Sequence, residues 1–210
     1  NRRFEPIEQS YGIKDTILYA LGVCCGDDPT DRRDLRFVYE EGLQALPTMA
    51  TVLCSPGFWL KQPDTGVNWQ QVLHGEQFLV IHRPLAPSGR LSGRQWIEEI
   101  IDKGEGRGAL IYVRRELTDA DTGELVCTVG LSSFARADGG FGGPSGPVRP
   151  VHKLPEREPD LVCDLPTWRH SGLVYRLNGD FNPIHADPSA AASAGFERPI
   201  LHGLCTYGIA

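Results

Sequence analysis

The sequence lacks the features that mark several large classes of protein. It contains no run of 18 apolar residues, so we expect no membrane span. It shows no basic stretch followed by an apolar one at its start, and we expect no signal peptide. It has no excess of positive charge, because the formal net charge is −6. A nucleic-acid-binding surface is therefore not expected.

The cysteines lack the spacing of a zinc site or of a disulfide framework. There are six of them and no two form a CxxC pair, while two are adjacent in sequence. Several lie in apolar stretches, which is typical of buried thiols. We therefore predict reduced cysteines in an intracellular protein, and no metal site, for Cys24, Cys25, Cys54, Cys127, Cys163 and Cys205.

One abrupt change of composition divides the chain. With 210 residues it is long enough for one or two domains with a real core. Residues 138–160 are rich in glycine and proline, which predicts a linker that runs over the surface. The sequence thus predicts an N-terminal domain at 1–137 and the start of a C-terminal domain at 161–210.

The N-terminal part predicts mainly strands. Residues 1–14 are polar and are expected to form a surface lead-in. Asp15-Thr16 should cap a short helix that Gly22 ends. Residues 49–54 form an apolar segment that the pattern alone leaves as strand or helix. Strands are expected at 36–40, 78–82, 93–102, 109–118 and 124–135, with glycine-containing turns between the last three.

The most informative stretch is 175–210. It brings an acid, an amide and an imidazole into six residues, Asp180, Asn182 and His185. Asn182-Pro183 excludes a continuous helix there, since proline lacks an N–H and disfavours helical geometry in the residue before it. On a bent loop, Asp180 and His185 can face one small molecule. An acid and a histidine that share a water molecule form a familiar acid/base arrangement.

An apolar helix is expected directly after this loop. Pro199 stands where a helix can begin, and residues 200–207 are apolar on nearly every side, which is typical of a buried helix. Gly203 would lie in its first turn, where backbone N–H groups have no intrahelical partner. Without a side chain at Gly203, a substrate oxygen could approach the bare N–H, as in an oxyanion site.

These residues resemble a known family. The sequence YRLNGDFNPIH at 175–185, then AGF at 194–196 and RPILHG at 198–203, is similar to the signature of the MaoC-like, (R)-specific enoyl-CoA hydratases. The similarity is strongest to the hydratase portion of peroxisomal multifunctional β-oxidation enzymes. It implies an α+β double hot-dog fold, in which a curved antiparallel sheet wraps one apolar helix in each copy. Residues 49–54 would then be the central helix of the first copy.

The resemblance also implies a function. The reaction would be reversible hydration of trans-2-enoyl-CoA to (3R)-3-hydroxyacyl-CoA, with Asp180 and His185 activating a water molecule and Asn182 orienting it. The Gly203 N–H would stabilise charge on the thioester oxygen. His202 and Arg198 are candidates for binding the substrate, Arg198 through a coenzyme A phosphate. The alternatives are a packing role at the helix N-terminus for His202 and a surface charge for Arg198. Coenzyme A enters only as part of the substrate, so no separate cofactor is expected. We expect a homodimer in the cytoplasm, with the peroxisome as the alternative compartment.

His74 and Glu76 form a second possible acid/base pair. Strand alternation would put both side chains on one face of a strand. The surrounding segment lacks the Asp-x-Asn-Pro-x-His pattern, however. The first half is therefore expected to keep the fold without the chemistry.

Three alternatives remain open. A hot-dog thioesterase would need a carboxylate on the central helix, and residues 200–210 contain none. A MaoC-like dehydratase of fatty-acid, polyketide or sterol side-chain synthesis would share every residue named above. A non-catalytic thioester-binding module would keep only the fold. Because residues 161–210 are fewer than a domain usually needs, we also expect the second hot dog to lack several C-terminal strands here.

Overall fold

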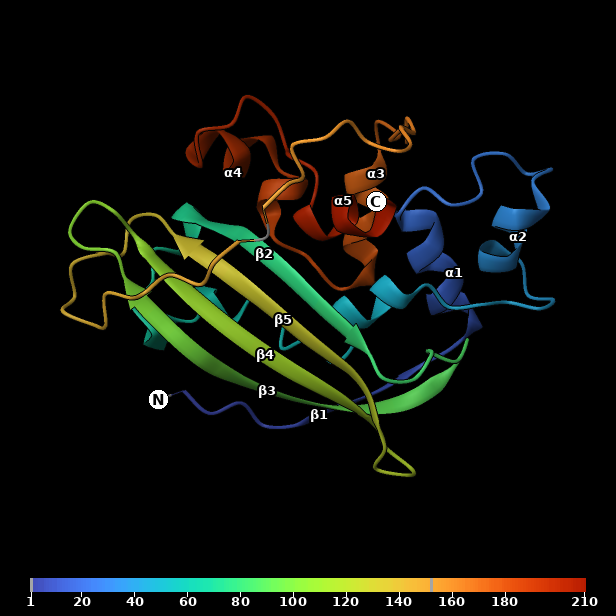
Figure 1. Cartoon of the computed structure of the whole chain (residues 1–210), viewed down its shortest axis with the longest axis horizontal. Helices are drawn as coiled ribbons and strands as arrows, with labels where there is room; N and C mark the ends of the chain where they lie inside the picture. Colours follow the sequence, from blue (N-terminus) through green and yellow to red (C-terminus); the bar gives the residue numbers. More distant parts are fainter. Residues whose placement is uncertain (1, 152) are drawn as a thin grey trace.

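The computed structural model describes residues 2–151 and 153–210. Within this range, five strands form one antiparallel sheet in the order β1-β3-β4-β5-β2 (Figure 1). The strands are β1 (Ile7–Tyr11), β2 (Val72–Ile81), β3 (Gly89–Asp102), β4 (Ala109–Asp119) and β5 (Leu125–Ala135). The α-helices are α1 (Ile13–Gly22), α2 (Arg32–Val38), α3 (Ser171–Tyr175), α4 (Pro188–Ser193) and α5 (Gly203–Ile209). Short 3₁₀ helices are η1 (Pro47–Thr51), η2 (Trp59–Lys61), η3 (Pro63–Thr65), η4 (Trp69–Gln71), η5 (Arg176–Asn178) and η6 (Pro183–His185).

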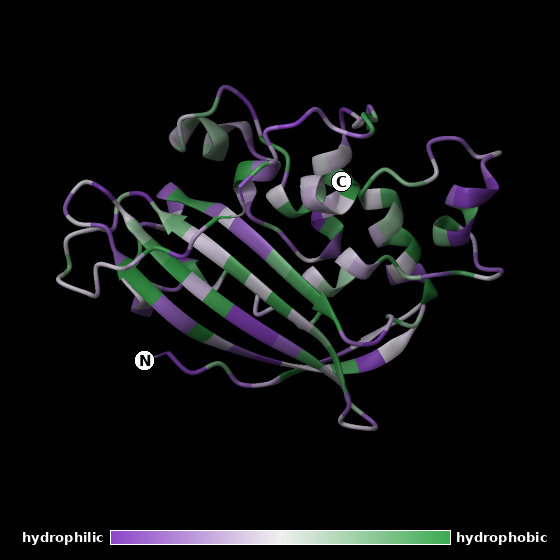
Figure 2. Ribbon diagram, in the orientation of Figure 1, coloured by the Kyte–Doolittle hydropathy of each residue, from purple (hydrophilic) through white to green (hydrophobic). Residues whose placement is uncertain are grey.

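The three long strands β3, β4 and β5 form where the sequence predicts them. Their hairpin turn between β4 and β5 is built by Asp119, whose carboxylate accepts the backbone N–H groups of Asp121 and Thr122 at 3.0 Å each. Along β4, alternate residues are buried and all of them except Arg115 are apolar, which is the pattern of a strand with one face on a core. Figure 2 shows this alternation of hydrophobic and hydrophilic residues along the strands.

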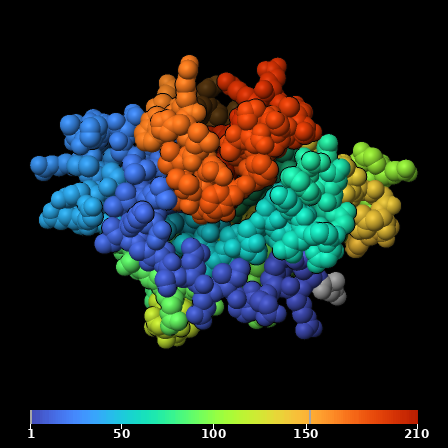
Figure 3. Space-filling view, turned by 180° about the vertical axis from the view of Figure 1, so that it is seen from behind, coloured from blue at the N-terminus to red at the C-terminus, as the bar shows by residue number. Residues whose placement is uncertain are grey.

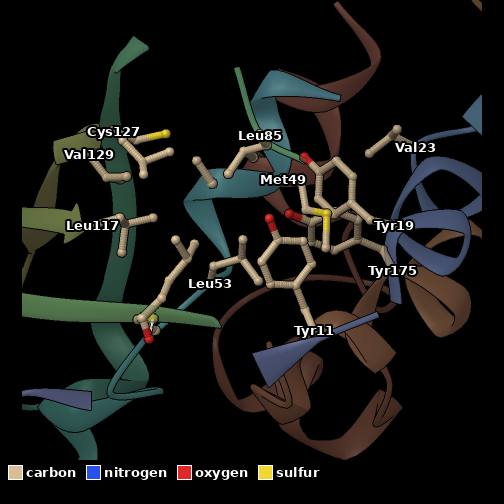
Figure 4. Packing of buried hydrophobic residues seen from close by; sticks show 14 of the residues in the cluster. Tyr11, Tyr19, Val23, Met49, Leu53, Leu85, Leu117, Cys127, Val129 and Tyr175 are labelled. Atoms are coloured by element: carbon tan, nitrogen blue, oxygen red, sulfur yellow. Dashed lines mark hydrogen bonds between the residues drawn. The ribbon is translucent and has the colours of Figure 1, made fainter. Parts of the chain in front are cut away.

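The main core lies between one face of the sheet and the helices. Tyr19 of α1 and Tyr175 of α3 meet edge to face, with ring centroids 6.1 Å apart. Met49 of η1 and Leu53 fill the space between these rings and the sheet (Figure 4). Cys205 of α5 is fully buried in the same cluster. The core thus joins the N-terminal sheet to the segment that carries the Asp180 loop.

A second, smaller cluster lies toward the other end of the sheet. Leu60 packs there against Val72 of β2 and against Ile111 and Val113 of β4. The partly buried Phe58 and Trp59 cover it. The sheet therefore carries two apolar regions, and the boundary between them runs across β4.

The segment that joins the two halves is fixed to the sheet at two points. It contains no helix or strand among its described residues from 136 to 170. The Asp102 carboxylate accepts backbone N–H groups of Gly140 and Gly142 at 2.7 and 2.8 Å. Further along, the Arg149 guanidinium lies over the Tyr112 ring, 4.1 Å from its centroid, and pairs with Glu98. The linker thus packs against the sheet, and we call residues 138–160 the strap.

Several expectations for the N-terminal half were wrong. Residues 7–11 of the expected lead-in form strand β1, which pairs with β3. The expected strand at 36–40 belongs mostly to helix α2, because Asp31 caps that helix by accepting the Arg33 N–H at 2.9 Å. The helix capped by Asp15-Thr16 begins earlier, at Ile13, so that Asp15 lies inside the first turn and accepts the Gly12 N–H.

The two central helices also differ from expectation. The apolar segment at 49–54 is covered only in part by the five-residue 3₁₀ helix η1, which Pro47 begins. Helix α5 begins at Gly203, and neither Pro199 nor Ile200 is part of it. Residues 200–202 instead form an extended approach, because the Ile200 N–H and C=O are both bonded to residues of the 184–185 turn.

Burial around α5 is uneven. Cys205 is completely buried, whereas Ile200, Leu201 and Leu204 are only half-buried. The expectation of further C-terminal strands stays a prediction. All six cysteines lie in described residues and are unpaired. No helix in the described part of the chain has the length and apolarity to cross a membrane.

Candidate active site

The residues singled out by the sequence meet at a cavity of about 450 Å³. Its wall combines the 179–185 loop and the start of α5 with β2 and the segment around η1 and η2. In the space-filling view, the C-terminal residues (orange to red) lie against the teal segment of the N-terminal half (Figure 3). The cavity is therefore shared between the two halves of the chain.

The bend of the loop is set by its own side chains. Gly179 has a φ of 113°, a left-handed value that glycine adopts without strain. The Asp180 carboxylate accepts the Asn182 backbone N–H at 3.2 Å, and the Asn182 side-chain oxygen accepts the Ile184 N–H at 3.3 Å. Pro183 then begins η6. This turn places Asp180, Asn182 and His185 together in the cavity wall.

His185 is held in one tautomer. Its Nδ1 lies 2.8 Å from the Ile200 carbonyl oxygen. A carbonyl can only accept, so Nδ1 carries the proton and Nε2 has a free lone pair. The imidazole is thus oriented by backbone and keeps one nitrogen available as a proton acceptor.

His202 lies behind His185 and stacks on it, with ring centroids 3.7 Å apart. It is 1% exposed and is not in the cavity wall. Its Nε2 donates to the Asp180 carbonyl at 3.2 Å, while no partner for Nδ1 occurs among the described residues. Burial, helped by His185, lowers the pKa of His202 to about 4 although Asp180 opposes the shift. His202 is thus a neutral support of the loop. It does not line the cavity, so the structure does not support its candidate role in binding the substrate.

The acid/base groups are close enough to share a small ligand. One carboxylate oxygen of Asp180 and one ring nitrogen each of His185 and His202 lie within 4.8 Å of one another. Such a set could in principle hold a metal ion. The two imidazoles are stacked with planes 25° apart, however, so their lone pairs run side by side and do not converge on one point. Asp180 and His185 are thus the two acid/base groups that the cavity wall brings together.

Gly203 supplies an open N–H at the edge of the cavity. It is the first residue of α5, and its N–H has no acceptor among the described residues. A methyl group placed there would touch only the His74 side chain, at 3.7 Å from Cβ. The position thus has room for an approaching ligand oxygen, as the sequence predicted.

Arg198 is exposed and does not line the cavity. A contact between Arg198 and a coenzyme A phosphate would therefore lie outside the cavity, and it stays a prediction. Together, four of the six predicted site residues lie in the cavity wall: Asp180, Asn182, His185 and Gly203.

The expected pairing of His74 and Glu76 on one face was wrong. A β-bulge falls between these two residues, so that strand alternation is broken at Gly75. A side chain at Gly75 would come within 2.7 Å of the Ser132 hydroxyl, which explains a glycine in the bulge. His74 lines the cavity next to Gly203, whereas Glu76 accepts a hydrogen bond from Ser132 and does not.

The resemblance led us to expect that the first hot dog leaves room for a long acyl chain, but the sequence did not identify which of its residues line this cavity. Apolar side chains of Phe58, Trp59 and Leu60 line one side, and Leu131 of β5 lies with them. Arg115 of β4 is also in the wall and is almost completely buried. The first half thus supplies most of the apolar lining, while the second supplies the acid/base groups.

Two family models match the chain. The MFE-2 hydratase 2 N-terminal domain matches residues 9–137, and the MaoC like domain matches residues 150–210. Among curated proteins, 3-hydroxyacyl-thioester dehydratase Y of Mycobacterium tuberculosis is 41% identical, over 98% of this chain and 71% of the relative. The peroxisomal enoyl-CoA hydratase 2 of Arabidopsis thaliana is 37% identical, over 96% of this chain and 70% of the relative.

Solved structures agree on the fold. A MaoC-like dehydratase from Phytophthora capsici superposes with a TM-score of 0.81 at 32% identity, over 99% of this chain and 72% of that one. A Mycobacterium tuberculosis protein described as a double hot-dog fold has a TM-score of 0.56 at 14% identity, over 100% of this chain and 73% of that one. The chain accordingly has the predicted hot-dog fold: its described residues contain one sheet, and residues 171–210 supply the loop and helix of the second copy.

Proposed function

The chain belongs to the MaoC-like hydratase 2 family, and we propose that it catalyses the reversible hydration of trans-2-enoyl-CoA to (3R)-3-hydroxyacyl-CoA. One observation carries the proposal at the level of chemistry. An Asp180 carboxylate oxygen and a His185 ring nitrogen lie within 4.8 Å of each other, in a cavity that also holds the free Gly203 N–H. These are an acid/base pair and an oxyanion donor, the groups that addition of water to an enoyl thioester needs.

The first step is activation of water. A water molecule held between Asp180 and His185 loses a proton to one of the pair as its oxygen forms a bond to C3. Because Nδ1 of His185 is bonded to the Ile200 carbonyl, the acceptor on the histidine is Nε2. Asn182 holds the loop with its side-chain oxygen, so its amide nitrogen remains free to orient the water or the carboxylate.

The second step is charge stabilisation and protonation. As oxygen adds to C3, electrons of the C2=C3 bond move toward the thioester carbonyl, whose oxygen becomes negative. The Gly203 N–H faces this oxygen and stabilises it where the charge develops. A proton then returns to C2 from the acid/base pair, and the hydroxyl remains on C3. The pair ends with the same number of protons as it began with.

The direct test is to incubate the protein with an enoyl-CoA and to measure hydration as the loss of absorbance of the conjugated thioester. Chiral analysis of the 3-hydroxyacyl product tests the (3R) configuration. No turnover with any chain length, under conditions where the protein is folded, would exclude the assignment. Asp180→Asn serves as the matched inactive control, since it keeps the shape of the side chain and removes its charge.

The reverse reaction is the second candidate. A relative that is 41% identical to this chain over 211 aligned residues is named a 3-hydroxyacyl-thioester dehydratase. The same residues catalyse both directions, because each step above is reversible. Comparing coenzyme A thioesters with carrier-protein thioesters as substrates distinguishes a role in degradation from one in synthesis.

We also propose that the protein acts as a homodimer in the cytoplasm, with a peroxisome as the alternative. Light scattering tests the oligomeric state, and fluorescent tagging tests the compartment.

A further inference from the structure

A buried arginine lies in the cavity wall without an acidic partner. Arg115 is 3% exposed, and it forms no ion pair with any described residue. Its Nη2 donates to the Thr51 carbonyl at 2.6 Å, and its Nη1 makes only a long contact of 3.4 Å with the Gln95 side-chain oxygen. A buried charge is costly unless it is paired and fully hydrogen-bonded. Capping the end of η1 therefore explains only part of this side chain.

Two donors at Arg115 and its neighbour Gln95 are unsatisfied. Its Nε–H has no acceptor among the described residues, and neither does the buried Nε2 of Gln95. Because Gln95 accepts from Arg115 through its oxygen, its amide nitrogen is the group left free. Of these two residues, Arg115 lines the cavity and Gln95 does not, so an acceptor group of a ligand would meet the arginine.

The surroundings of Arg115 point to the distal part of a bound acyl chain. On the inward face of β4 it stands between Val113 of the smaller apolar cluster and Leu117 of the main core. The same cavity holds the acid/base pair and the apolar side chains of Phe58 and Trp59. A ligand that places its thioester at Gly203 can thus lay an apolar chain along these rings and reach the guanidinium.

The guanidinium is a cation at neutral pH. Burial lowers the pKa of Arg115 to about 10, which still leaves it protonated at pH 7. A planar carboxylate offers two oxygens, which match the fork of N–H donors on an arginine. A terminal methyl group in the same place would leave these donors without solvent or acceptor.

On the premise of the hydratase activity proposed above, we infer that Arg115 binds a carboxylate at the far end of the acyl chain. The protein then selects ω-carboxy-2-enoyl thioesters over unsubstituted enoyl thioesters of the same length. In this role Arg115 is a specificity-determining residue, remote from the bonds that change.

The test compares pairs of substrates that differ only at the end of the chain. For wild type, kcat/KM is measured with ω-carboxy and plain enoyl-CoA across a series of lengths. At the length that reaches Arg115, the ω-carboxy substrate should be favoured by about 10- to 100-fold, the range typical of a hydrogen bond to a charged group. In Arg115→Met this preference should disappear or reverse. Arg114→Met is the matched control, since Arg114 is exposed on the opposite face and pairs with Glu98 at 2.6 Å; it should keep the wild-type ratio.

Each outcome decides the inference. Equal or lower kcat/KM for the ω-carboxy substrate at every length overturns it, as does a ratio that Arg115→Met leaves unchanged; the arginine is then only a cap for η1. Should Arg115→Met fail to fold, calorimetry on wild type with saturated ω-carboxyacyl-CoA and acyl-CoA gives the same comparison. That binding ratio also separates the two proposals: the absence of any turnover refutes the hydratase activity, whereas tighter binding of the ω-carboxy thioester still supports the role of Arg115.

Discussion

The imidazole rings of His185 and His202 stack with centroids 3.7 Å apart and planes inclined by 25°. Only the outer ring, His185, lines the cavity, and both rings are fixed through hydrogen bonds to backbone carbonyls. Two stacked imidazoles cannot both be charged at low cost. His185 is therefore the ring that can meet a substrate, and His202 is its neutral support. Because His202 must stay neutral, it makes the fold sensitive to acid.

The stability of the protein should fall as the pH drops from 6.5 toward 4. The pKa of His202 is about 4 in the folded protein and near 6.5 in the unfolded chain, so the unfolded chain binds a proton first. The contribution of neutral His202 is complete above pH 6.5 and is lost through this window. At pH 5 the loss should be about 2 kcal/mol.

Urea unfolding of wild type and His202→Gln between pH 7.5 and 5 measures this effect. The variant should lose less free energy of unfolding over the window than wild type. His185, Asp180 and Arg176, which also act on His202, and His74 in the cavity wall remain in both proteins. Parallel curves for the two proteins would show that His202 is not the group responsible.

Asp180→Asn and His185→Gln should each lower kcat by roughly 10²- to 10⁴-fold with a modest change in KM, because general acid/base groups act in the transition state. Steady-state kinetics with one enoyl-CoA measures this. Glu76→Gln is the control: its carboxylate is outside the cavity and bonded to Ser132, so it should keep near wild-type kcat. Activity within threefold of wild type in either cavity variant contradicts the assignment.

The strap between the two halves should depend on one carboxylate. Asp102 accepts four backbone N–H groups, from Gly104, Gly140, Gly142 and Gly143, and these bonds hold its pKa below the usual range. Asp102→Asn replaces one acceptor oxygen by a donor, so part of the strap must detach. Limited proteolysis should cut residues 138–160 several times faster in this variant. Asp160→Asn removes only an exposed ion pair with Arg157 at the far end of the same segment and should change the rate little.

Much of this structure follows from local pattern. The strands at 93–102, 109–118 and 124–135 were predictable because turn-rich loops separate segments of about ten residues, and the turn at 119–123 carries the residues that a hairpin needs. The burial of Arg115 was not predictable in the same way, because only the structure shows that it lies on the buried face of β4 between Val113 and Leu117. Helix α2 was missed because its apolar residues have strand composition, and a single cap at Asp31 outweighed them.

The rest depends on contacts distant in sequence. Asp180, Asn182 and His185 were predictable because their chemistry lies within one turn of the chain. Phe58 and Trp59 were not, because they lie in a segment of short 3₁₀ turns whose position is set by packing on β2 and β4. His202 shows a further limit: its sequence position beside Gly203 left both a substrate contact and a packing role open, and only three-dimensional packing shows its ring stacked behind His185.

Two glycines on α5 should separate catalysis from packing. A methyl group on Gly203 has room, since within 4 Å it would meet only His74 at 3.7 and 3.8 Å. It would stand where the thioester oxygen approaches the N–H. Gly203→Ala should therefore keep the thermal midpoint and lose turnover, at a cost of up to about 2.7–4 kcal/mol in transition-state stabilisation, the range for loss of an oxyanion donor.

Gly208, five residues further along the same helix, is the matched contrast. A methyl group there would lie 2.6 Å from Val23 Cγ1 and 2.9 Å from the Tyr19 hydroxyl oxygen, which is closer than atoms can pack. Gly208→Ala should lower the thermal midpoint and keep near wild-type turnover per folded molecule. Calorimetry and activity on the same samples compare the two. If Gly203→Ala instead loses stability and its folded fraction turns over normally, Gly203 serves helix packing, and the thioester oxygen must be stabilised by another donor in the cavity.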